Sequence, residues 1–391
     1  MNEELINILE HARNNVPYYQ LKFNKIGSFK NKANFKKIPL LSKQDIINNP
    51  TQLIAKGYRR ETLIEDYTSG STGTSLIFYR HKRESSKASL LLWNLRRRWV
   101  PDITQIPMLK FYAVKIQEGH ILNEPFYFEN GNVYISLFNL NNDDFHKCWT
   151  KIYNMKIKKL WIFGCPSAVF KLASFIKQNK QFHGIVKFIE LSGEVVFPEQ
   201  KEFMKKVFNC PVMNNYGTAE LWGIAYEQID GRLHILDKNV HVEVVDENGI
   251  PLSYGEKGEV VVTGLTNYAM PFIRYRVGDL GTIVKNDDSS EVLELHGGRV
   301  TDYILTKNGE TVNSVLIYFI ILKINQARSH VQQFQATQND LYNFTIKLVL
   351  MPSAEKKWVE KIFYQQMKHY LGEETEIKFV YFENLPQGKK T

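Results

Sequence analysis

Short apolar runs alternate with helix-like segments through the first 215 residues, and this alternation limits the fold more than any other feature of the sequence. Strand-like runs rich in Val, Ile and Phe lie at residues 109–114, 159–164 and 186–191. Amphipathic patterns at 167–178 and 198–208 predict helices, the second with Pro198 at a favourable first-turn position. This order of elements indicates a largely parallel sheet covered by helices.

The pattern changes twice farther along the chain. After about residue 230, short strands alternate with glycine turns such as Asn248-Gly249, which predicts a β-rich subdomain. From residue 299 onward, strands mixed with two helices predict a small α+β unit, its last helix capped by Ser353 with Glu355 in the first turn.

We therefore predict an α/β protein of two domains. Residues 1–298 form a large N-terminal domain of mixed sheets covered by helices, with the β-rich subdomain at about 230–298. Residues 299–391 form a small mobile C-terminal domain. We expect the hinge at residues 299–302, because two glycines just before it lower the cost of a backbone swing.

Composition excludes several classes of protein. Apolar residues make up 43% of the 391 residues, enough for a sizeable core, so a mainly disordered chain is not indicated. Fifty basic and 41 acidic residues leave a net charge of +9, but the basic residues are scattered. Their one tight cluster, Arg96–Arg98, is interpreted as the solvated face of a helix, and no nucleic-acid partner is expected.

The sequence also predicts a cytoplasmic protein without a membrane span. Leu5, Ile8, Leu9 and Ala12 have helical spacing in an N-terminus that resembles an amphipathic helix more than a signal peptide. No apolar stretch approaches the roughly 20 residues that a span needs. The three cysteines are far apart and odd in number, so neither a disulfide framework nor a paired-cysteine zinc site is expected.

A run of hydroxyls and glycines, YTSGSTGTS at residues 67–75, stands directly before the strand-like LIFYR. Glycines let backbone N–H groups approach phosphate oxygens closely, and Ser and Thr hydroxyls add donors. No Gly-Lys-Ser/Thr follows and the next segment is a strand, so the run is not a Walker loop. By itself it is equally compatible with an ordinary polar turn.

Further motifs follow in a fixed order: LSGE at 191–194, NNYGTAE at 214–220, RYRVGDL at 274–280, GRVTD at 298–302 and LPQGKK at 385–390. Together with HARNNVPYY near the N-terminus and FGCPS at 163–167, this set resembles the acyl-adenylate-forming superfamily. That superfamily includes acyl-CoA synthetases, luciferases and the adenylation domains of peptide synthetases. Within it the chain looks most like the phenylacetate-CoA ligase branch and its capsular-polysaccharide-type relatives.

The resemblance spans nearly the whole chain and implies an ATP- and Mg²⁺-dependent enzyme. Such an enzyme converts a carboxylic acid into an acyl-AMP and passes the acyl group to a thiol such as CoA. An acyl carrier protein's phosphopantetheine, or an amine, is an alternative acceptor. A non-catalytic homologue that only binds nucleotide is the remaining possibility.

The resemblance also implies which residues bind the nucleotide. The phosphates would be held by Ser69, Gly70, Ser71, Thr72 and Gly73, with Thr72 also acting in catalysis. The base would be lined by Ser192, Gly193, Glu194, Asn215, Tyr216, Gly217 and Thr218. Asp279 would bind the ribose hydroxyls, and Arg299 the ribose or a phosphate. A turn aspartate is the simpler interpretation of Asp279.

Two charged residues are expected to act directly on the reaction. Glu220 matches the family's magnesium-binding glutamate, since a hard cation prefers a carboxylate oxygen. A solvated acid at a helix N-terminus is its simpler interpretation. Lys389 matches the family's catalytic lysine, although Lys390 beside it fits nearly as well and both resemble a basic tail.

The acid pocket is predicted from small and aromatic residues: Phe163, Gly164, Cys165, Pro166 and Trp222. These residues favour an aryl or short acyl acid, but core packing explains them equally well. Three positions depart from the family pattern. Thr74 replaces a common lysine, Thr301 stands at the usual Asp or Lys pivot, and residues 226–237 lack the zinc cysteines of some relatives.

Overall fold

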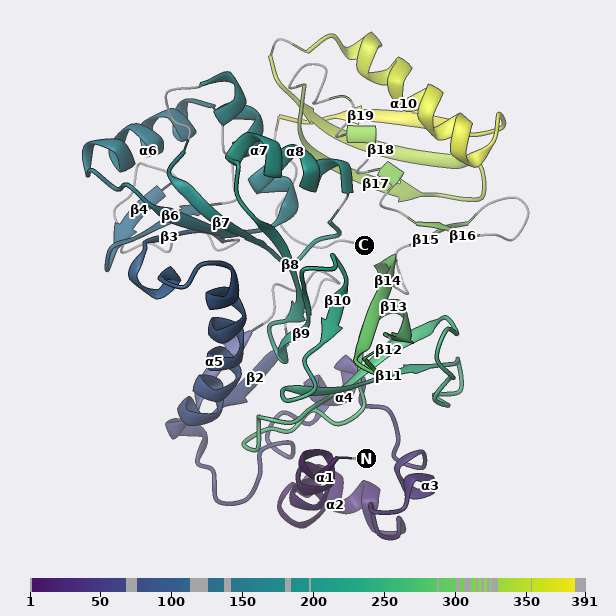
Figure 1. Ribbon diagram of the computed structural model, residues 1–391. Coiled ribbons are helices and arrows are strands. Elements are labelled where there is room, and N and C mark those ends of the chain that lie inside the picture. Colours follow the sequence, from purple (N-terminus) through teal and green to yellow (C-terminus); the bar gives the residue numbers. More distant parts are fainter. Residues whose placement is uncertain are drawn as a thin grey trace. The chain divides into compact units, whose positions relative to one another are not determined.

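The chain forms two compact units (Figure 1). One consists of Met1–Ser69, Leu76–Val277 and Gly281–Leu295, and the other includes Gly278–Leu280 and His296–Thr391. The structure, a computed structural model, describes residues 2–67, 76–112, 126–136, 142–179, 184–196, 198–286, 288–299, 303–305, 311–313, 316–317, 320–321, 324, 330–352 and 354–383.

A twelve-stranded sheet organises the first unit, in the order β11-β12-β13-β14-β10-β9-β8-β7-β6-β3-β5-β4. Five neighbouring strands of it run parallel: β3 (Met108–Tyr112), β5 (Asn132–Ser136), β6 (Leu160–Gly164), β7 (Val186–Leu191) and β8 (Val212–Thr218). The edge strand β4 (Phe126–Glu129) is antiparallel to β5. The predicted, largely parallel sheet is thus confirmed for this half.

Helices cover both faces of the parallel strands (Figure 1). One face carries α6 (Asn142–Asn154), α7 (Pro166–Gln178) and α8 (Pro198–Phe208), and the other carries α5 (Lys82–Trp99). Adjacent residues of one strand serve opposite layers: Ile162 packs with α6–α8, whereas Trp161 packs with α5. Continuous apolar runs are needed because both faces of these strands are buried.

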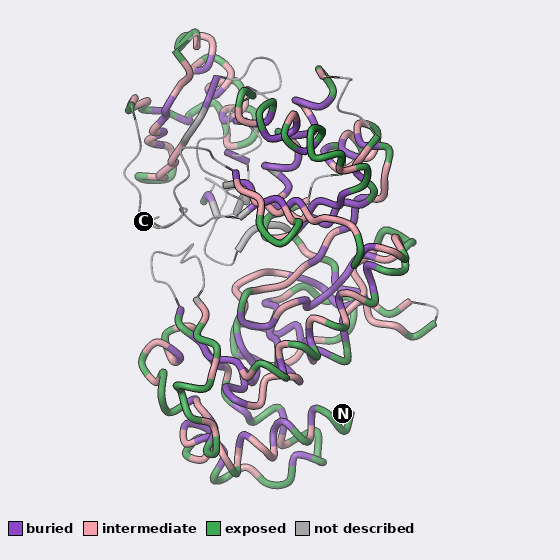
Figure 2. The backbone as a smooth tube through the Cα atoms, turned by 90° about the vertical axis from the view of Figure 1, so that its left-hand side faces the viewer, coloured by how far each residue is buried: buried purple, intermediate pink, exposed green. Residues whose placement is uncertain are grey.

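The other half of the sheet is antiparallel. It contains β9 (Trp222–Glu227), β10 (Leu233–Ile235), β11 (Val240–Val245), β12 (Gly258–Gly264), β13 (Tyr275–Lys285) and β14 (Glu291–Arg299). These strands confirm the change of pattern predicted after residue 230. Buried residues follow the sheet strands and the inner faces of the helices (Figure 2).

The N-terminal segment packs on this antiparallel half. It forms α1 (Glu3–Asn15), α2 (Pro17–Phe23), α3 (Lys32–Phe35) and α4 (Lys43–Asn48). The predicted apolar stripe of α1 is buried in one cluster with β11 and β12. Arg274, at φ +47° and fully buried, donates to Ile38 O at 2.6 Å and Gly249 O at 2.8 Å and pairs with Glu243 at 3.0 Å. It ties the segment to the sheet.

A separate hairpin, β1 (Ile64–Tyr67) and β2 (Ile77–Arg80), flanks residues 68–75. Short 3-10 helices occur at Arg60–Thr62 and Ile103–Gln105. Among the described residues, no helix is both long and apolar enough to cross a membrane.

The second unit has the α+β character that the sequence predicts. The hairpin β15 (Tyr303–Leu305) and β16 (Thr311–Asn313) is followed by a three-stranded sheet of β17 (Val331–Gln338), β18 (Asn343–Leu350) and β19 (Glu376–Tyr381), with α10 (Lys356–Leu371) packed in the same apolar cluster. The predicted start of the last helix is wrong: Glu355 is itself the N-cap residue of α10 and makes no side-chain cap hydrogen bond. Ser353 lies outside the described residues.

Candidate active site

Three predicted site segments meet at one edge of the parallel sheet. Gly164 of β6 is in register with Leu191 of β7, which is in register with Asn214 of β8. The carboxyl ends of these strands, and therefore residues 163–166, 192–194 and 214–218, lie next to one another. Ligands of open α/β sheets bind outside this edge.

The loop after β7 has a backbone that favours glycine. The N–H of Ser192 donates to Gly164 O at 3.0 Å, which links this loop to the end of β6. Gly193 follows at φ +87°, with open space around the position a Cβ would occupy. A glycine is favoured there by the left-handed conformation and not by crowding. Glu194 is exposed at the same edge.

The residues predicted to line the acid pocket have evident packing roles at the end of β6. Phe163 packs against the α5-side cluster. A Cβ at Gly164 would lie 2.7 Å from the Phe111 ring, so only glycine fits. Cys165 is the N-cap residue of α7 but makes no side-chain cap hydrogen bond, and Pro166 starts that helix. Their role in binding the carboxylic acid substrate remains a prediction.

Asn215 turns its side chain into the protein interior. It is only 6% exposed, and its amide Nδ2 donates to Glu190 Oε1 at 2.9 Å. Arg96 donates to both oxygens of the same carboxylate at 2.7 Å, and the Tyr226 hydroxyl donates to it at 2.8 Å. A completely buried carboxylate is therefore held by four hydrogen bonds directly beneath the predicted base-binding segments.

This network corrects the interpretation of the arginine cluster. Arg97 and Arg98 are exposed, but Arg96 is 8% exposed, because it lies one turn after Leu92 on the buried face of α5. Sequence reasoning missed both partners of this ion pair. The signal was a glutamate, Glu190, inside an otherwise apolar parallel strand, where a charge needs a partner.

The turn between β8 and β9 is tightly built. Tyr216 packs against the N-terminal core cluster. A Cβ at Gly217 would lie 1.9 Å from Trp222 O, so this position requires glycine. The Thr218 hydroxyl accepts from Leu221 N at 3.2 Å, and Trp222 adopts φ +62°. These constraints hold Glu220 in one place.

Glu220 is 7% exposed and accepts a hydrogen bond from the Tyr275 hydroxyl at 2.9 Å. It lies in a strand-to-strand turn, so the alternative of a solvated acid at a helix N-terminus is wrong. The charge of Glu220 also acts on Arg80: burial lowers the pKa of this guanidinium, and the carboxylates of Asp66 and Glu220 oppose that shift.

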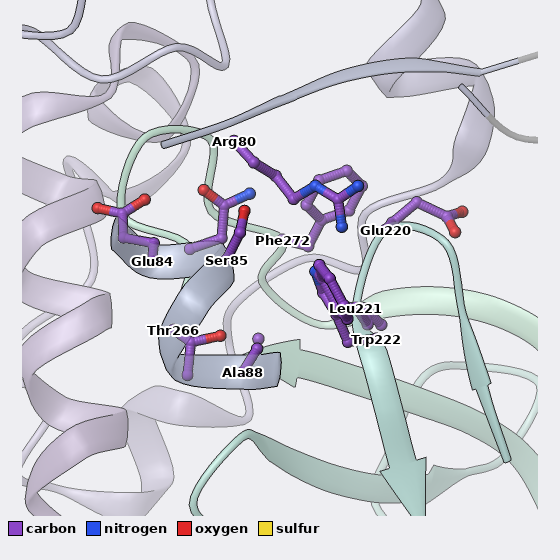
Figure 3. Close-up of a pocket in the computed structure, with 11 residues that line it drawn as sticks. Arg80, Glu84, Ser85, Ala88, Glu220, Leu221, Trp222, Thr266 and Phe272 are labelled. Carbon is purple, nitrogen blue, oxygen red and sulfur yellow. The ribbon is translucent and has the colours of Figure 1, made fainter. Parts of the chain in front are cut away.

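A small pocket lies against this turn (Figure 3). Arg80, Trp222 and Glu220 line it, together with Glu84, Ser85, Ala88, Leu221, Gly264, Thr266, Asn267 and Phe272. Within the described part of the chain, Arg80 Nε, Ser85 Oγ and Trp222 Nε1 are buried without a hydrogen-bond partner. Phe163–Pro166 are not among the lining residues of this pocket, although Phe163 and Trp222 both pack against the α5-side cluster.

Comparison with known proteins decides the family. The family described as AMP-binding enzyme matches residues 131–270, and the family described as CapK C-terminal domain matches residues 304–390. Protein CapK of Staphylococcus aureus is 24% identical over 100% of this chain and 87% of its own length. Phenylacetate-coenzyme A ligase of Escherichia coli (strain K12) is 22% identical over 97% of this chain and 90% of its own.

The chain belongs to the acyl-adenylate-forming superfamily. Within it, the chain is of the phenylacetate-CoA ligase-like, CapK type, as the sequence motifs predicted. A crystal structure of 2-hydroxyisobutyryl-CoA ligase in the postadenylation state shares the fold, with a TM-score of 0.69 and 15% identity over 98% of this chain and 85% of that one. The protein is an acyl-adenylate-forming ligase.

In this ligase, the carboxylate of Glu220 is chemically suited to bind a magnesium ion. Mg²⁺ prefers oxygen ligands and is usually held by one or two carboxylates, with phosphate oxygens and water completing the shell. Glu220 would supply one such carboxylate, and the Tyr275 hydroxyl donates a hydrogen bond to its Oε1. No group of three or more His, Cys, Asp or Glu residues in the described segments could hold a metal by itself.

The remaining predicted nucleotide-binding and catalytic residues of this ligase lie in the second unit or outside the described residues. Asp279 is half-buried in β13 directly after Gly278, which has φ +88°, and it belongs to the second unit. Arg299 ends β14, with its side chain outside the described part. Outside the described residues lie also Ser69, Gly70, Ser71, Thr72, Gly73, residues 300–302 of the expected hinge, Lys389 and Lys390.

Proposed function

We propose that this ligase uses ATP and Mg²⁺ to activate an aryl or short acyl carboxylic acid as acyl-AMP, and then transfers the acyl group to the thiol of CoA. The observation that carries the proposal is the meeting of the LSGE and NNYGTAE segments at one sheet edge, where β8 continues into the turn that holds Glu220. The relative named phenylacetate-coenzyme A ligase supports both the aryl acid and CoA.

In the first step, a carboxylate oxygen of the acid attacks the α-phosphorus of ATP, and the bond to the β-phosphate breaks to release pyrophosphate. Catalysis then depends mainly on positioning and on charge neutralisation. Ser69, Gly70, Ser71, Thr72 and Gly73 would hold the phosphates. Glu220 would hold Mg²⁺, which supplies neutralisation of the phosphate charge.

The nucleoside would lie at the sheet edge. Ser192–Glu194 and Tyr216–Thr218 would line the base, and Asp279 and Arg299 would bind the ribose. Asn215 supports this surface from inside through its bond to Glu190.

Lys389 would stabilise the charge that develops between carboxylate and α-phosphate. A unit charge about 4 Å from an oxyanion contributes ~4 kcal/mol at an effective dielectric of roughly 20. We place this lysine in a mobile C-terminal domain, residues 299–391, that rotates about residues 299–302. In the second step the thiol sulfur of CoA attacks the acyl carbon and AMP leaves.

Exchange of labelled pyrophosphate into ATP, measured across a panel of carboxylic acids, tests the first step. Asp279→Ala should weaken ATP binding. Lys389→Ala should slow exchange at least about tenfold, a loss of ~1.4 kcal/mol or more, and Lys390→Ala, measured in parallel, shows which of the two neighbouring lysines is catalytic. Unchanged ATP affinity or an unchanged exchange rate removes the respective residue from the site.

The acceptor is tested by product mass with CoA, a phosphopantetheinylated carrier protein or amines. A thioester of CoA supports the proposal, and acylated carrier or amide identifies one of the alternatives. If ATP binds but no acid in the panel gives exchange, the chain is a non-catalytic nucleotide-binding homologue.

A further inference from the structure

Arg80 stands at the end of the hairpin that carries the proposed phosphate loop. In this hairpin Tyr67 is in register with Ile77, and residues 68–75 connect the two strands. Arg80 Nη2 forms an ion pair with the Asp66 carboxylate of the opposite strand. The register places these two residues as diagonal neighbours, so their pairing ties β1 to β2, with Arg80 opposite Ile64 at the end of the hairpin away from Tyr67 and Ile77.

The same guanidinium reaches the turn that holds Glu220. Arg80 Nη1 donates to the carbonyl oxygen of Ala219 at 3.3 Å, and its Cζ lies 4.8 Å from the centre of the Trp222 ring. Arg80 therefore contacts the residue before Glu220 and the residue two positions after it. On the other side, Tyr275 bonds to the Glu220 carboxylate. Figure 3 shows the side chains of Arg80, Glu220 and Trp222, which line the same pocket.

The shape of arginine explains why this residue suits the position. A planar guanidinium can donate in several fixed directions while it stacks on aromatic rings, whereas the ammonium of lysine is a compact point charge. Arg80 is 8% exposed, and its Cζ also lies 5.0 Å from the Phe78 ring centre. One rigid group thus joins two segments that are 139 positions apart in sequence.

We propose that Arg80 is a positioning residue that holds the β8–β9 turn, and with it the metal-binding Glu220, against strands β1 and β2. The inference rests on the proposed role of Glu220. Arg80 acts through the hairpin and the turn and need not touch the nucleotide. Its loss should therefore weaken metal and pyrophosphate binding more than binding of AMP, which lacks the β- and γ-phosphates.

The test uses the whole protein and Mn²⁺ as a spectroscopic probe. Mn²⁺ binding is measured by electron paramagnetic resonance in the presence of a non-hydrolysable ATP analogue, and AMP binding by calorimetry. Arg80→Lys should raise the Kd of Mn²⁺ about tenfold, the lower end of effects seen for residues that orient metal ligands. The KM of pyrophosphate in exchange should rise similarly, and AMP affinity should change less than about threefold.

Two further variants keep the test decisive. Asp66→Asn removes the ion pair between Arg80 and β1 but keeps the hydrogen bond from Arg80 to Ala219. This variant should also raise the Kd of Mn²⁺, so it provides a test even if Arg80→Lys folds poorly. Arg232→Met, which breaks a pair with Glu294 elsewhere in the same unit, should leave Mn²⁺ affinity unchanged.

The outcomes separate this inference from the proposed function. Wild-type Mn²⁺ affinity in folded Arg80→Lys or Asp66→Asn overturns the positioning role, as does an equal loss of AMP affinity. Glu220→Gln tests the underlying assignment: if Mn²⁺ affinity does not fall in that variant, Glu220 is not the metal ligand and the proposed site itself is wrong.

Discussion

Replacing Arg96 with methionine should destabilise the first unit severely. Methionine keeps most of the apolar contacts of the arginine stem but removes two hydrogen bonds of 2.7 Å to Glu190. Glu190 has no exposed surface, so its charge cannot be compensated by solvent. Asn215 and Tyr226 would still donate to it, but neither carries a positive charge.

The expected loss is about 3–5 kcal/mol, because removing one partner leaves an uncompensated buried charge. A unit of more than 200 residues shifts its unfolding midpoint by roughly 2 °C for each kcal/mol, so the midpoint should fall by roughly 6–10 °C. Arg97→Met, on the exposed side of the same helix, should change stability by less than about 0.5 kcal/mol.

Tryptophan fluorescence during urea unfolding provides the assay. The rings of Trp93 and Trp161 lie 4.8 and 5.1 Å from the Arg96 guanidinium, so their emission reports on this region. The double variant Arg96→Met/Glu190→Met removes both charges and should recover much of the loss. If Arg96→Met is no more destabilising than Arg97→Met, the buried ion pair has been misjudged.

Two further predictions concern the antiparallel half of the sheet. Gly217→Ala should lower the free energy of unfolding by several kcal/mol, because its Cβ would lie 1.9 Å from the Trp222 carbonyl oxygen. Gly255→Ala, at φ +87° in open space, should lower it by only about 1 kcal/mol through backbone strain. Urea unfolding of both variants measures the difference. Burial lowers the pKa of His241 to about 4 from 6.5, so the unfolded chain binds a proton that the folded chain does not, and stability should fall as the pH drops from about 6.5 to about 4. His241→Phe should reduce this loss by up to about 3 kcal/mol in unfolding experiments at pH 7 and pH 4, and an identical pH dependence in both proteins would contradict it.

Periodicity in the sequence predicted the elements of the fold well, because burial of apolar side chains determines them. The stripe of Leu5, Ile8, Leu9 and Ala12 is buried in α1, and the run at 186–191 coincides with β7. Parallel strands also have their carboxyl ends at the same edge, which explains why the segments after β6, β7 and β8 lie together once the structure shows that these strands are neighbours.

Long-range polar pairs could not be predicted in the same way. Arg96 and Glu190 are 94 positions apart in sequence. The local sequence around either residue does not indicate which residue is its partner. Arg80 shows the same limit, since its contacts with Asp66 and Ala219 depend on how the hairpin packs against the β8–β9 turn. The predicted start of α10 was wrong for a local reason. Glu355 occupies the N-cap position, although glutamate is not a favoured cap residue.

Some motif residues of this chain therefore have a structural explanation that needs no nucleotide. Arg274 belongs to the RYRVGDL motif, yet its guanidinium is wholly used in bonds to Glu243, Ile38 O and Gly249 O. Gly217 belongs to NNYGTAE, yet steric contact with a carbonyl explains it without a nucleotide. Substitutions at such positions should lower the free energy of unfolding first and activity only as a consequence. Residues that act on the nucleotide should show the reverse, and Asp279, which is only half-buried, is the motif position where that contrast can be measured most directly.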